Sequence, residues 1–427
     1  MLRTIIEGEP NFQSQLRALA DRCAVTPESI ESGARAIVAD VRARGDAALR
    51  ELTQRFESRA LSAIELPRAD WQAAAAGVSA PVRAALAEAA TRIRRYHERE
   101  RYQSYQTVEA GVRLNCRYSP LARVGIYVPG GTARYPSTVL MTAVPAKVAG
   151  VREVFMTTPG PSPETLAAAL EAGVDRVFLV GGAQAIAALA YGTESIPRVD
   201  KIVGPGNAYV AAAKRLVFGD VGIEMIAGPT EVVIAADATA NPAWVAADLL
   251  AQAEHDTMAV PILVAVGKEV AERVAREVDR QLALLPRQAI AEKALAGQGV
   301  AIVVNDAASA IAIVNQLAPE HAGIALGDAR AWAEKVTAAG AVFVGHDACE
   351  ALGDYFAGPS HVLPTNGSAR FSSPLGVGDF LKRTSFIEYS AGAVRKQAEA
   401  VACLAEVEGL SGHARSVLLR AKAGTSI

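Results

Sequence analysis

The chain has 427 residues, of which 51% are apolar, 21% charged and 5% aromatic. This composition is typical of a globular protein and excludes a disordered or fibrous chain, and the length accommodates roughly two to four domains. Forty-three basic and forty-five acidic residues give a net charge of −2, so charge does not favour a nucleic-acid partner.

The sequence predicts a cytoplasmic protein without membrane contact. The opening stretch "MLRTIIEGEPNF" lacks the apolar run of a signal peptide, and no apolar stretch reaches the roughly 18 residues that a membrane helix needs. The cysteines are far apart and form no CxxC pair, so we expect buried thiols in a reducing compartment. They are Cys23, Cys116, Cys349 and Cys403.

The region before residue 103 is predicted to be largely helical. Apolar positions recur at helical spacing over 26–56, where Thr26 and Pro27 form a cap and a first turn. A second helical region over 70–102 ends in the charged run "RIRRYHERER", which indicates a solvated helix tip rather than a nucleic-acid patch. We therefore expect His97, within this run, to be solvated.

After Pro120, strands and helices alternate. Apolar runs such as "VGIYV" and "RVFLV" are separated by helical stretches, and a second series of the same kind runs from "VVIAAD" to "AVFVG". This alternation predicts parallel sheets with helices on both faces. We therefore predict an α/β fold with two doubly wound domains, followed by a mainly helical C-terminal segment.

Three glycine-rich turns follow strands of the first series. They span 127–132, 180–185 and 203–209. In open α/β sheets, ligands bind at the carboxyl ends of strands, where such turns let the backbone approach the ligand. Tyr127, Gln184 and Asn207 are polar side chains on these turns that could meet a nucleotide. None of the turns is the GxGxxG fingerprint, and a glycine turn can also serve tight geometry alone.

The segment "LLAQAEHD" closes a predicted helix with several polar groups. Gln252 and His255 are three residues apart and share a face, so an amide oxygen and an imidazole nitrogen could hold one metal ion. Two ligands are too few for a stable site, and a polar helix end with a satisfied histidine is the alternative. Asp354 and three histidines in other short polar clusters are further candidates. These histidines are His321, His361 and His413.

The segment "PEH" is predicted to lie on a loop between a helix and a strand. Glu320 and His321 could divide acid/base work there, since imidazole exchanges protons near neutral pH and a carboxylate can activate water. Taken alone, the pair leaves open whether the loop is catalytic.

Together these segments resemble the histidinol dehydrogenase family. The similarity covers nearly the whole chain and includes "VGIYVPGGTARYPSTVLMTAVPAKVAGV", "KIVGPGNAYVAAAK", "IAGPTEV", "DLLAQAEHD", "APEH", "GDYFAGPSHVLPT" and "EGLSGH". The resemblance implies a zinc-dependent enzyme that oxidises L-histidinol through L-histidinaldehyde to L-histidine with two NAD+, completing histidine biosynthesis. It also implies a homodimer with shared active sites and no nucleic-acid or membrane partner.

The resemblance further implies two incomplete Rossmann-like domains with parallel sheets, plus small N-terminal and C-terminal helical pieces. The expected bounds are 1–21 for an N-terminal arm, 22–126 and 233–375 for the first Rossmann-like domain, 127–232 for the second, and 376–427 for the C-terminal piece. The metal and catalytic residues are expected in the first of these domains, NAD on the side of the second, and the C-terminal piece in the partner's site.

Matched motif by motif, the resemblance also implies residue roles. The zinc ligands are Gln252, His255, Asp354 and His413, with His413 coming from the second subunit. His321 is the general base and Glu320 activates water. Substrate contacts come from the zinc ligands and His321, together with Thr230, His361 and Glu408. The nucleotide positions are Tyr127, Gln184 and Asn207.

Three departures from the family pattern remove none of these residues. Ala322 stands where leucine is usual, Thr230 where serine is common, and Ala348-Cys349 where Thr-Pro is usual. Thr230 keeps a hydroxyl group, so its contact with substrate is retained.

Other functions compete with this hypothesis. The nearest is a zinc- and NAD-dependent dehydrogenase of the same fold that oxidises another primary alcohol, either amino or sulfonated; Glu408, which can pair with a substrate ammonium, argues against it. A hydrolase using Glu320 and a metal-bound water lacks the HExxH motif. A non-catalytic nucleotide-binding module is the third alternative. An all-nitrogen/oxygen ligand set accepts manganese or cobalt as well as zinc, so the sequence leaves the metal open.

Overall fold

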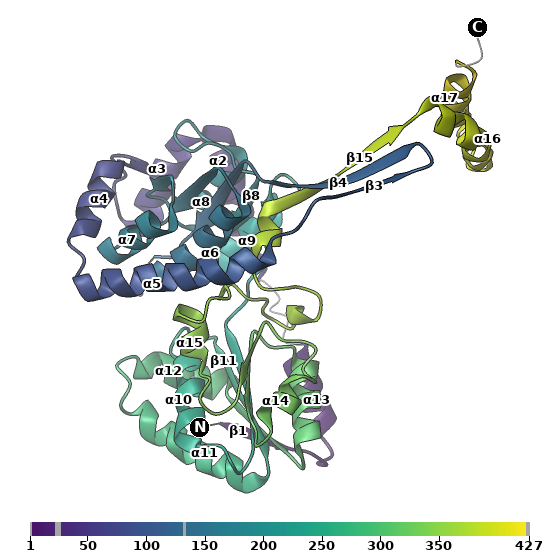
Figure 1. Cartoon of the computed structure of the whole chain (residues 1–427). Coiled ribbons are helices and arrows are strands. Elements are labelled where there is room, and N and C mark those ends of the chain that lie inside the picture. The colour runs from purple at the N-terminus through teal and green to yellow at the C-terminus, as the bar shows by residue number, and fades with distance from the viewer. Residues whose placement is uncertain (1, 22–26, 131–133, 424–427) are drawn as a thin grey trace. The chain divides into compact units, whose positions relative to one another are not determined.

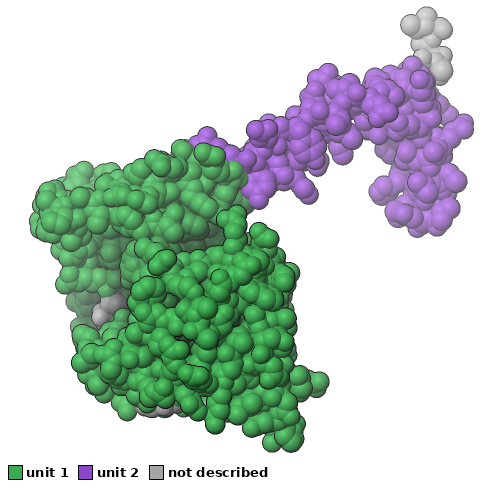
Figure 2. All heavy atoms as spheres, turned by 60° about the horizontal axis from the view of Figure 1, so that its bottom comes forward, with its two compact units in different colours: residues 1–100, 121–380 green, residues 101–120, 381–427 purple. Residues whose placement is uncertain are grey.

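The computed structural model describes residues 2–21, 27–130 and 134–423 and has an α/β fold, as Figure 1 shows. Two six-stranded sheets, built from strands that alternate with helices, confirm the predicted fold class. Two compact units are distinguished in Figure 2, the first with residues 1–100 and 121–380 and the second with 101–120 and 381–427. The predicted cap residue Thr26, Cys23 and turn positions 131 and 132 lie outside the described residues.

The first sheet has the strand order β2-β7-β6-β5-β8-β9. All neighbours are parallel except β2, which runs antiparallel to β7. The strands are β2 (Glu65–Leu66), β5 (Arg123–Tyr127), β6 (Glu153–Thr157), β7 (Arg176–Phe178), β8 (Lys201–Val203) and β9 (Gly222–Ile223). The helices between them are α6 (Pro136–Ala149), α7 (Pro163–Ala172), α8 (Gly182–Tyr191) and α9 (Ala208–Val217). β5 is buried from its second residue onward, as expected for a parallel strand covered on both faces.

Four earlier helices pack beside this first sheet. They are α2 (Glu28–Arg44), α3 (Asp46–Glu57), α4 (Arg68–Ala76) and α5 (Ala80–His97). α2 contacts α8 and α9, and α5 contacts α6 and α7. This arrangement differs from the predicted bounds, which grouped 22–126 with 233–375. An amphipathic pattern shows that a helix buries one face, but it does not show which sheet that face meets.

His97, the last residue of α5, is 1% exposed, so the prediction that it is solvated was wrong. Its Nδ1 lies 2.8 Å from Glu100 Oε2, in the 3-10 helix η1 (Glu98–Glu100), and its ring meets Tyr96 edge-on. His97 follows the buried Ile93 by four residues and therefore shares its face of the helix.

The second sheet is entirely parallel and has the order β1-β12-β11-β10-β13-β14. Its strands are β1 (Arg3–Ile6), β10 (Glu231–Ala236), β11 (Val260–Val266), β12 (Val300–Val304), β13 (His321–Ala325) and β14 (Ala341–Val344). The associated helices are α1 (Phe12–Ala20), α10 (Pro242–Ala253), α11 (Lys268–Leu282), α12 (Gln288–Gln298), α13 (Ala307–Leu317), α14 (Ala329–Ala333) and α15 (Glu350–Tyr355). The N-terminal segment supplies the edge strand β1 and α1, which packs on α13. Two apolar clusters cover the two faces of the sheet.

The chain direction determines which sheet edges carry polar groups. β10 begins after Thr230 and β13 begins after Glu320. Both residues therefore lie at the end of the second sheet where its parallel strands begin, which we call its amino edge. α10 runs back from the carboxyl end of β10, which brings His255 to the same amino edge. In the first sheet, by contrast, the glycine turns follow the carboxyl ends of β5, β7 and β8.

The second unit combines an antiparallel sheet with a helix pair. The sheet has the order β15-β4-β3, formed by β3 (Tyr105–Glu109), β4 (Val112–Pro120) and β15 (Leu381–Tyr389). α16 (Ala391–Val407) and α17 (Ser411–Lys422) confirm the predicted helical character of the C-terminal segment, whereas β15 was not predicted. The 3-10 helices η2 (Ser368–Arg370) and η3 (Val377–Phe380) lie before β15 in the sequence and belong to the first unit. Among the described residues, none of the helices combines the length and apolar character needed to cross a membrane.

Candidate active site

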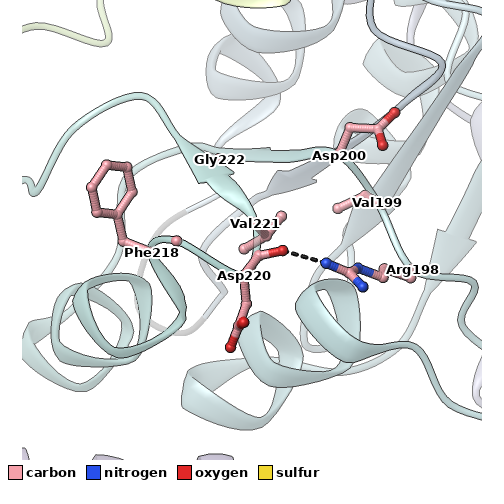
Figure 3. A pocket seen from close by; sticks show the side chains of 8 residues that line it. Arg198, Val199, Asp200, Phe218, Asp220, Val221 and Gly222 are labelled. Carbon is pink, nitrogen blue, oxygen red and sulfur yellow. Dashed lines mark hydrogen bonds between the residues drawn. The ribbon is translucent and has the colours of Figure 1, made fainter. Parts of the chain in front are cut away.

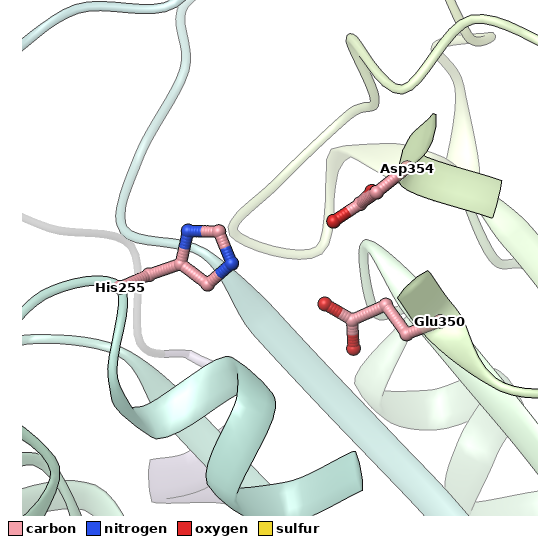
Figure 4. A group of neighbouring side chains, drawn as sticks. All are labelled: His255, Glu350 and Asp354. Atoms are coloured by element: carbon pink, nitrogen blue, oxygen red, sulfur yellow. The ribbon is translucent and has the colours of Figure 1, made fainter. Parts of the chain in front are cut away.

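Three side chains at the amino edge of the second sheet form a cluster that could hold a metal ion. One ligating atom from each of His255, Glu350 and Asp354 lies within 4.8 Å of the other two. Figure 4 shows His255, beyond the end of α10, facing the two carboxylates of α15. Glu350 and Asp354 are four residues apart and therefore lie on one face of that helix. One imidazole and two carboxylates are donors that suit zinc and other divalent transition metals, so the residues present fit the expected cation.

Gln252 is fully buried beside this cluster, and its amide links two segments. In the amide orientation that pairs donors with acceptors, Nε2 donates to Glu350 Oε2 at 2.9 Å and Oε1 accepts from the Glu231 amide at 2.9 Å. The Thr230 hydroxyl also contacts this amide. Gln252 thus connects α15 to the segment that enters β10.

His321, the first residue of β13, is 3% exposed and has one defined tautomer. Its Nδ1 lies 3.0 Å from the carbonyl oxygen of Glu231. Because a carbonyl can only accept, Nδ1 carries the proton, and Nε2 of the neutral ring keeps its lone pair. Nε2 lies 3.7 Å from Asp354 Oδ1 and has no hydrogen-bond partner within the described part of the chain. His321 can therefore accept a proton at Nε2, next to the metal-ligating cluster.

Burial and charge shift the pKa values of this group in opposing directions. Burial disfavours the charged imidazole of His321, but the negative charges of Glu320, Glu350 and Asp354 outweigh it and raise its pKa to about 10. Burial raises the pKa of Glu350 to about 8. The pKa of His255, in contrast, is lowered, because loss of hydration disfavours its charged imidazole. This favours the neutral form, which can bind a metal.

Glu320 lies directly before β13 and is held by two donors. Its Oε2 accepts from the Thr230 hydroxyl at 2.6 Å and from the Glu231 amide at 2.9 Å. Burial raises its pKa to about 7, although these donors and the nearby His321 oppose the rise. A carboxylate that ionises near neutral pH is suited to activate water.

His361 also lies close to Asp354. Its Nδ1 is 3.9 Å from Asp354 Oδ1, and its Nε2 is 3.5 Å from the hydroxyl of Thr138 on α6. Burial lowers the pKa of His361 and favours its neutral form. The structure therefore brings together seven of the predicted site residues: Thr230, Gln252, His255, Glu320, His321, Asp354 and His361.

Two of the three predicted nucleotide residues form hydrogen bonds within the glycine turns of the first sheet. The Tyr127 hydroxyl accepts a hydrogen bond from the Gly182 amide at 3.1 Å, so the first two turns are in contact. Gln184 is buried within α8. Asn207 caps α9 through its side-chain oxygen, which accepts from the amides of Tyr209 and Val210. Their contacts with a nucleotide stay predictions.

Glu408 and His413 belong to the second unit. Glu408 is the C-cap of α16, and His413 lies in the first turn of α17. Both are exposed, and the intervening backbone is fixed by hydrogen bonds such as Leu410 N to Ala405 O at 2.8 Å. The corner between α16 and α17 thus presents both side chains to the surroundings.

A pocket of about 310 Å³ lies elsewhere, lined by Arg198, Val199, Asp200 and residues 218–222 (Figure 3). These residues lie just before β8 and around the start of β9, so the pocket is at the amino edge of the first sheet, opposite its glycine turns. It contains none of the predicted site residues, and the Arg198 side chain donates to the Asp220 carbonyl across it.

Glu350 is the site residue that the sequence analysis missed. It contacts Gln252 and lies 3.9 Å from His321 Nδ1. Its position four residues before Asp354 was the available signal, because a helix in this segment places both carboxylates on one face.

Comparison with known proteins shows which family this chain is similar to. The family model for histidinol dehydrogenase matches residues 21–421. A histidinol dehydrogenase of Dechloromonas aromatica is 50% identical and covers 98% of this chain and 99% of that protein, and one of Nitrosomonas europaea is 49% identical with coverages of 97% and 98%. The crystal structure of histidinol dehydrogenase from Elizabethkingia anophelis is 35% identical and matches with a TM-score of 0.93, over 100% of this chain and 99% of that one. The chain belongs to the histidinol dehydrogenase family of oxidoreductases.

Proposed function

We propose that this chain is a zinc-dependent enzyme that oxidises L-histidinol to L-histidinaldehyde and then to L-histidine, reducing two NAD+ in succession. The observation that carries the proposal is the position of His321 Nε2, a buried proton acceptor 3.7 Å from a carboxylate of the metal-ligating cluster. A base adjoining a cation site can remove a proton from an alcohol held by that cation. Family membership provides the substrate hypothesis.

The proposed zinc ligands are Gln252, His255 and Asp354, together with His413 from a second copy of the chain. Zinc, when bound, would hold the imidazole and amino group of the substrate and so orient its alcohol carbon. Gln252 is fully buried beside Glu350. It would bind zinc through its amide oxygen, so ligation requires the amide to turn that oxygen toward the cluster. Positive charge beside Asp354 would also lower the pKa of His321 and free Nε2 to act as a base.

In the first oxidation, His321 Nε2 takes the hydroxyl proton while the carbon-bound hydride passes to NAD+. The product of this step is the aldehyde. Glu320 then takes a proton from water as the resulting hydroxide adds to the aldehyde carbon, and the same proton returns from Glu320 to the oxyanion, which gives the hydrate. In the second oxidation, Nε2 takes a hydroxyl proton of the hydrate and the remaining hydride passes to a second NAD+. Thr230 orients Glu320 for its step through the 2.6 Å hydrogen bond. His361 and Glu408 are proposed to contact substrate, and Tyr127, Gln184 and Asn207 to contact NAD+.

We propose further that the active unit is a homodimer with shared sites. The exposed residues of the second unit support this proposal, because Ile387 is 70%, Leu404 68% and Val407 82% exposed. Apolar side chains gathered on one small unit mark a surface for another protein chain. A second copy that covers it could also receive Glu408 and His413.

The proposed location is the cytoplasm. Cys116, Cys349 and Cys403 are free thiols, which accords with a reducing compartment.

The deciding experiment measures product stoichiometry. Purified protein supplied with zinc, NAD+ and L-histidinol should form two NADH for each L-histidine. One NADH with accumulating aldehyde would contradict the four-electron reaction. No turnover of histidinol, with turnover of another amino or sulfonated alcohol, would favour the rival dehydrogenase.

A further inference from the structure

A buried ion pair lies beside the third glycine turn, in which residues 204–207 connect β8 to α9. Lys214 of α9 and Glu224, which follows β9, have side chains 2% and 1% exposed, and Lys214 Nζ is 2.7 Å from Glu224 Oε1. The second carboxylate oxygen, Oε2, is buried with no hydrogen-bond partner among the residues that the structure describes. Apolar residues often stabilise such a position at least as well as a buried ion pair. Stability alone therefore gives a weak reason for this pair.

Both charged groups bind the backbone of Gly204. The Gly204 amide donates to Glu224 Oε1 at 2.7 Å, and Lys214 Nζ donates to the Gly204 carbonyl at 3.1 Å. Gly204 has a φ of +117°, and a Cβ at this position would collide with the Tyr127 carbonyl oxygen. The ion pair thus fixes the first residue of the turn, where the turn passes directly over the end of β5.

The other end of the turn is fixed by the same helix. Asn207 caps α9, with its side-chain oxygen 3.0 Å from the Tyr209 amide, and Lys214 lies further along that helix. The turn is therefore held at Gly204 by the ion pair and at Asn207 by the cap. The pair also joins the exit of β9, through Glu224, to the exit of β8.

We infer that Lys214 and Glu224 are positioning residues for the nucleotide: through Gly204 they set the conformation of the 204–207 turn, and hence the direction in which Asn207 and the first amides of α9 face. This inference rests on the proposed use of NAD+. Because both side chains are buried, they act on nucleotide affinity without touching the nucleotide. Their loss weakens NAD+ binding while leaving the metal and substrate groups of the second sheet in place.

The test replaces the pair by apolar side chains of similar length. The double variant Lys214→Met with Glu224→Met removes both bonds to Gly204 and leaves no unpaired buried charge, so its Tm should stay near that of the parent protein. Its Kd for NADH, measured by fluorescence titration, and its KM for NAD+ should rise about tenfold, the effect of roughly one lost hydrogen bond. Its zinc content and its KM for L-histidinol should not change.

Two further variants separate positioning from a merely structural role. Glu224→Gln keeps an oxygen for both the Gly204 amide and Lys214 Nζ, so its nucleotide affinity should stay within about twofold of the parent, although the unpaired charge of Lys214 should lower its Tm. Lys201→Met is the matched control, because Lys201 begins β8 at the opposite sheet edge and pairs with Asp379 at 2.8 Å. It should lower the Tm and leave the Kd for NADH unchanged.

A folded double variant that binds NADH as tightly as the parent protein overturns the inference. If the double variant does not fold, Lys214→Met combined with Glu224→Gln releases the Gly204 carbonyl, leaves no unpaired buried charge and takes its place under the same criterion. Failure of the parent protein itself to bind NADH would instead refute the proposed function.

Discussion

Replacing Thr230 with valine removes one buried hydroxyl group and nearly preserves the shape of the side chain. This hydroxyl donates to Glu320 Oε2 at 2.6 Å and contacts the Gln252 amide, whereas the second donor to Glu320, the Glu231 amide, is unaffected. A hydrogen bond to a charged acceptor is worth about 1.5–3 kcal/mol. We expect the free energy of unfolding of Thr230→Val to fall by about this amount, as measured by urea denaturation.

The same variant should affect the two oxidations unequally. The Thr230 hydroxyl opposes the burial that raises the pKa of Glu320 to about 7, so its removal raises this pKa further. Glu320 accepts a proton only when it is ionised, so the rate of L-histidinaldehyde oxidation should increase as the pH rises through about 7 in the parent protein. In Thr230→Val the midpoint of this increase should move to higher pH, and kcat with the aldehyde at neutral pH should fall about tenfold.

The matched control is Thr230→Ser, which keeps the hydroxyl and should retain both the pH profile and most of the rate. Separate assays with L-histidinol and L-histidinaldehyde distinguish the two halves of the reaction. Equal pH profiles for the valine and serine variants would refute the role given to the Thr230 hydroxyl.

Three other predictions concern the base, the metal ligands and the shared site. His321→Asn should abolish NADH formation while zinc content, measured by atomic absorption, stays unchanged; residual turnover near the parent rate would exclude Nε2 as the base. Asp354→Asn should weaken zinc binding by more than the roughly 10–100-fold typical of residues outside the ligand set, measured by chelator competition, and unchanged affinity would remove Asp354 from the site. His321→Asn mixed with His413→Asn should regain activity after joint refolding, because one site of a mixed dimer then contains both native residues; no recovery would place His413 in the site of its own chain.

The sequence predicted the α/β alternation because the buried strands have continuous apolar runs. β10, "EVVIAA", is buried throughout and is of this kind. β15, "LKRTSFIEY", is exposed over all but its first residue, so no buried face imposes an alternating pattern and the strand was not predicted. The charged neighbours of His97 concealed a buried position in the same way, although its spacing from Ile93 contained the signal.

The candidate site was predictable where one element carries several groups. The spacing of Gln252, on α10, and His255, just beyond its end, indicated a shared site, and His255 does lie with Asp354. The sequence could not show that the Gln252 amide pairs with Glu350, because that contact joins segments about 100 residues apart. The side to which α2–α5 pack was hidden for the same reason, since it depends on tertiary contacts rather than on local periodicity.

The hydrogen bond from His321 Nδ1 to the Glu231 carbonyl has a consequence for the order of events in catalysis. It leaves a single nitrogen through which protons can enter and leave the ring, so the imidazole cannot pass a proton from one side of the site to the other. In the proposed reaction, the proton gained during alcohol oxidation must therefore depart from Nε2 before the aldehyde hydrate can react. The proposed turnover would then include an obligatory deprotonation of His321 between the two hydride transfers, and buffer concentration or solvent deuterium should influence the interval between the first and second NADH.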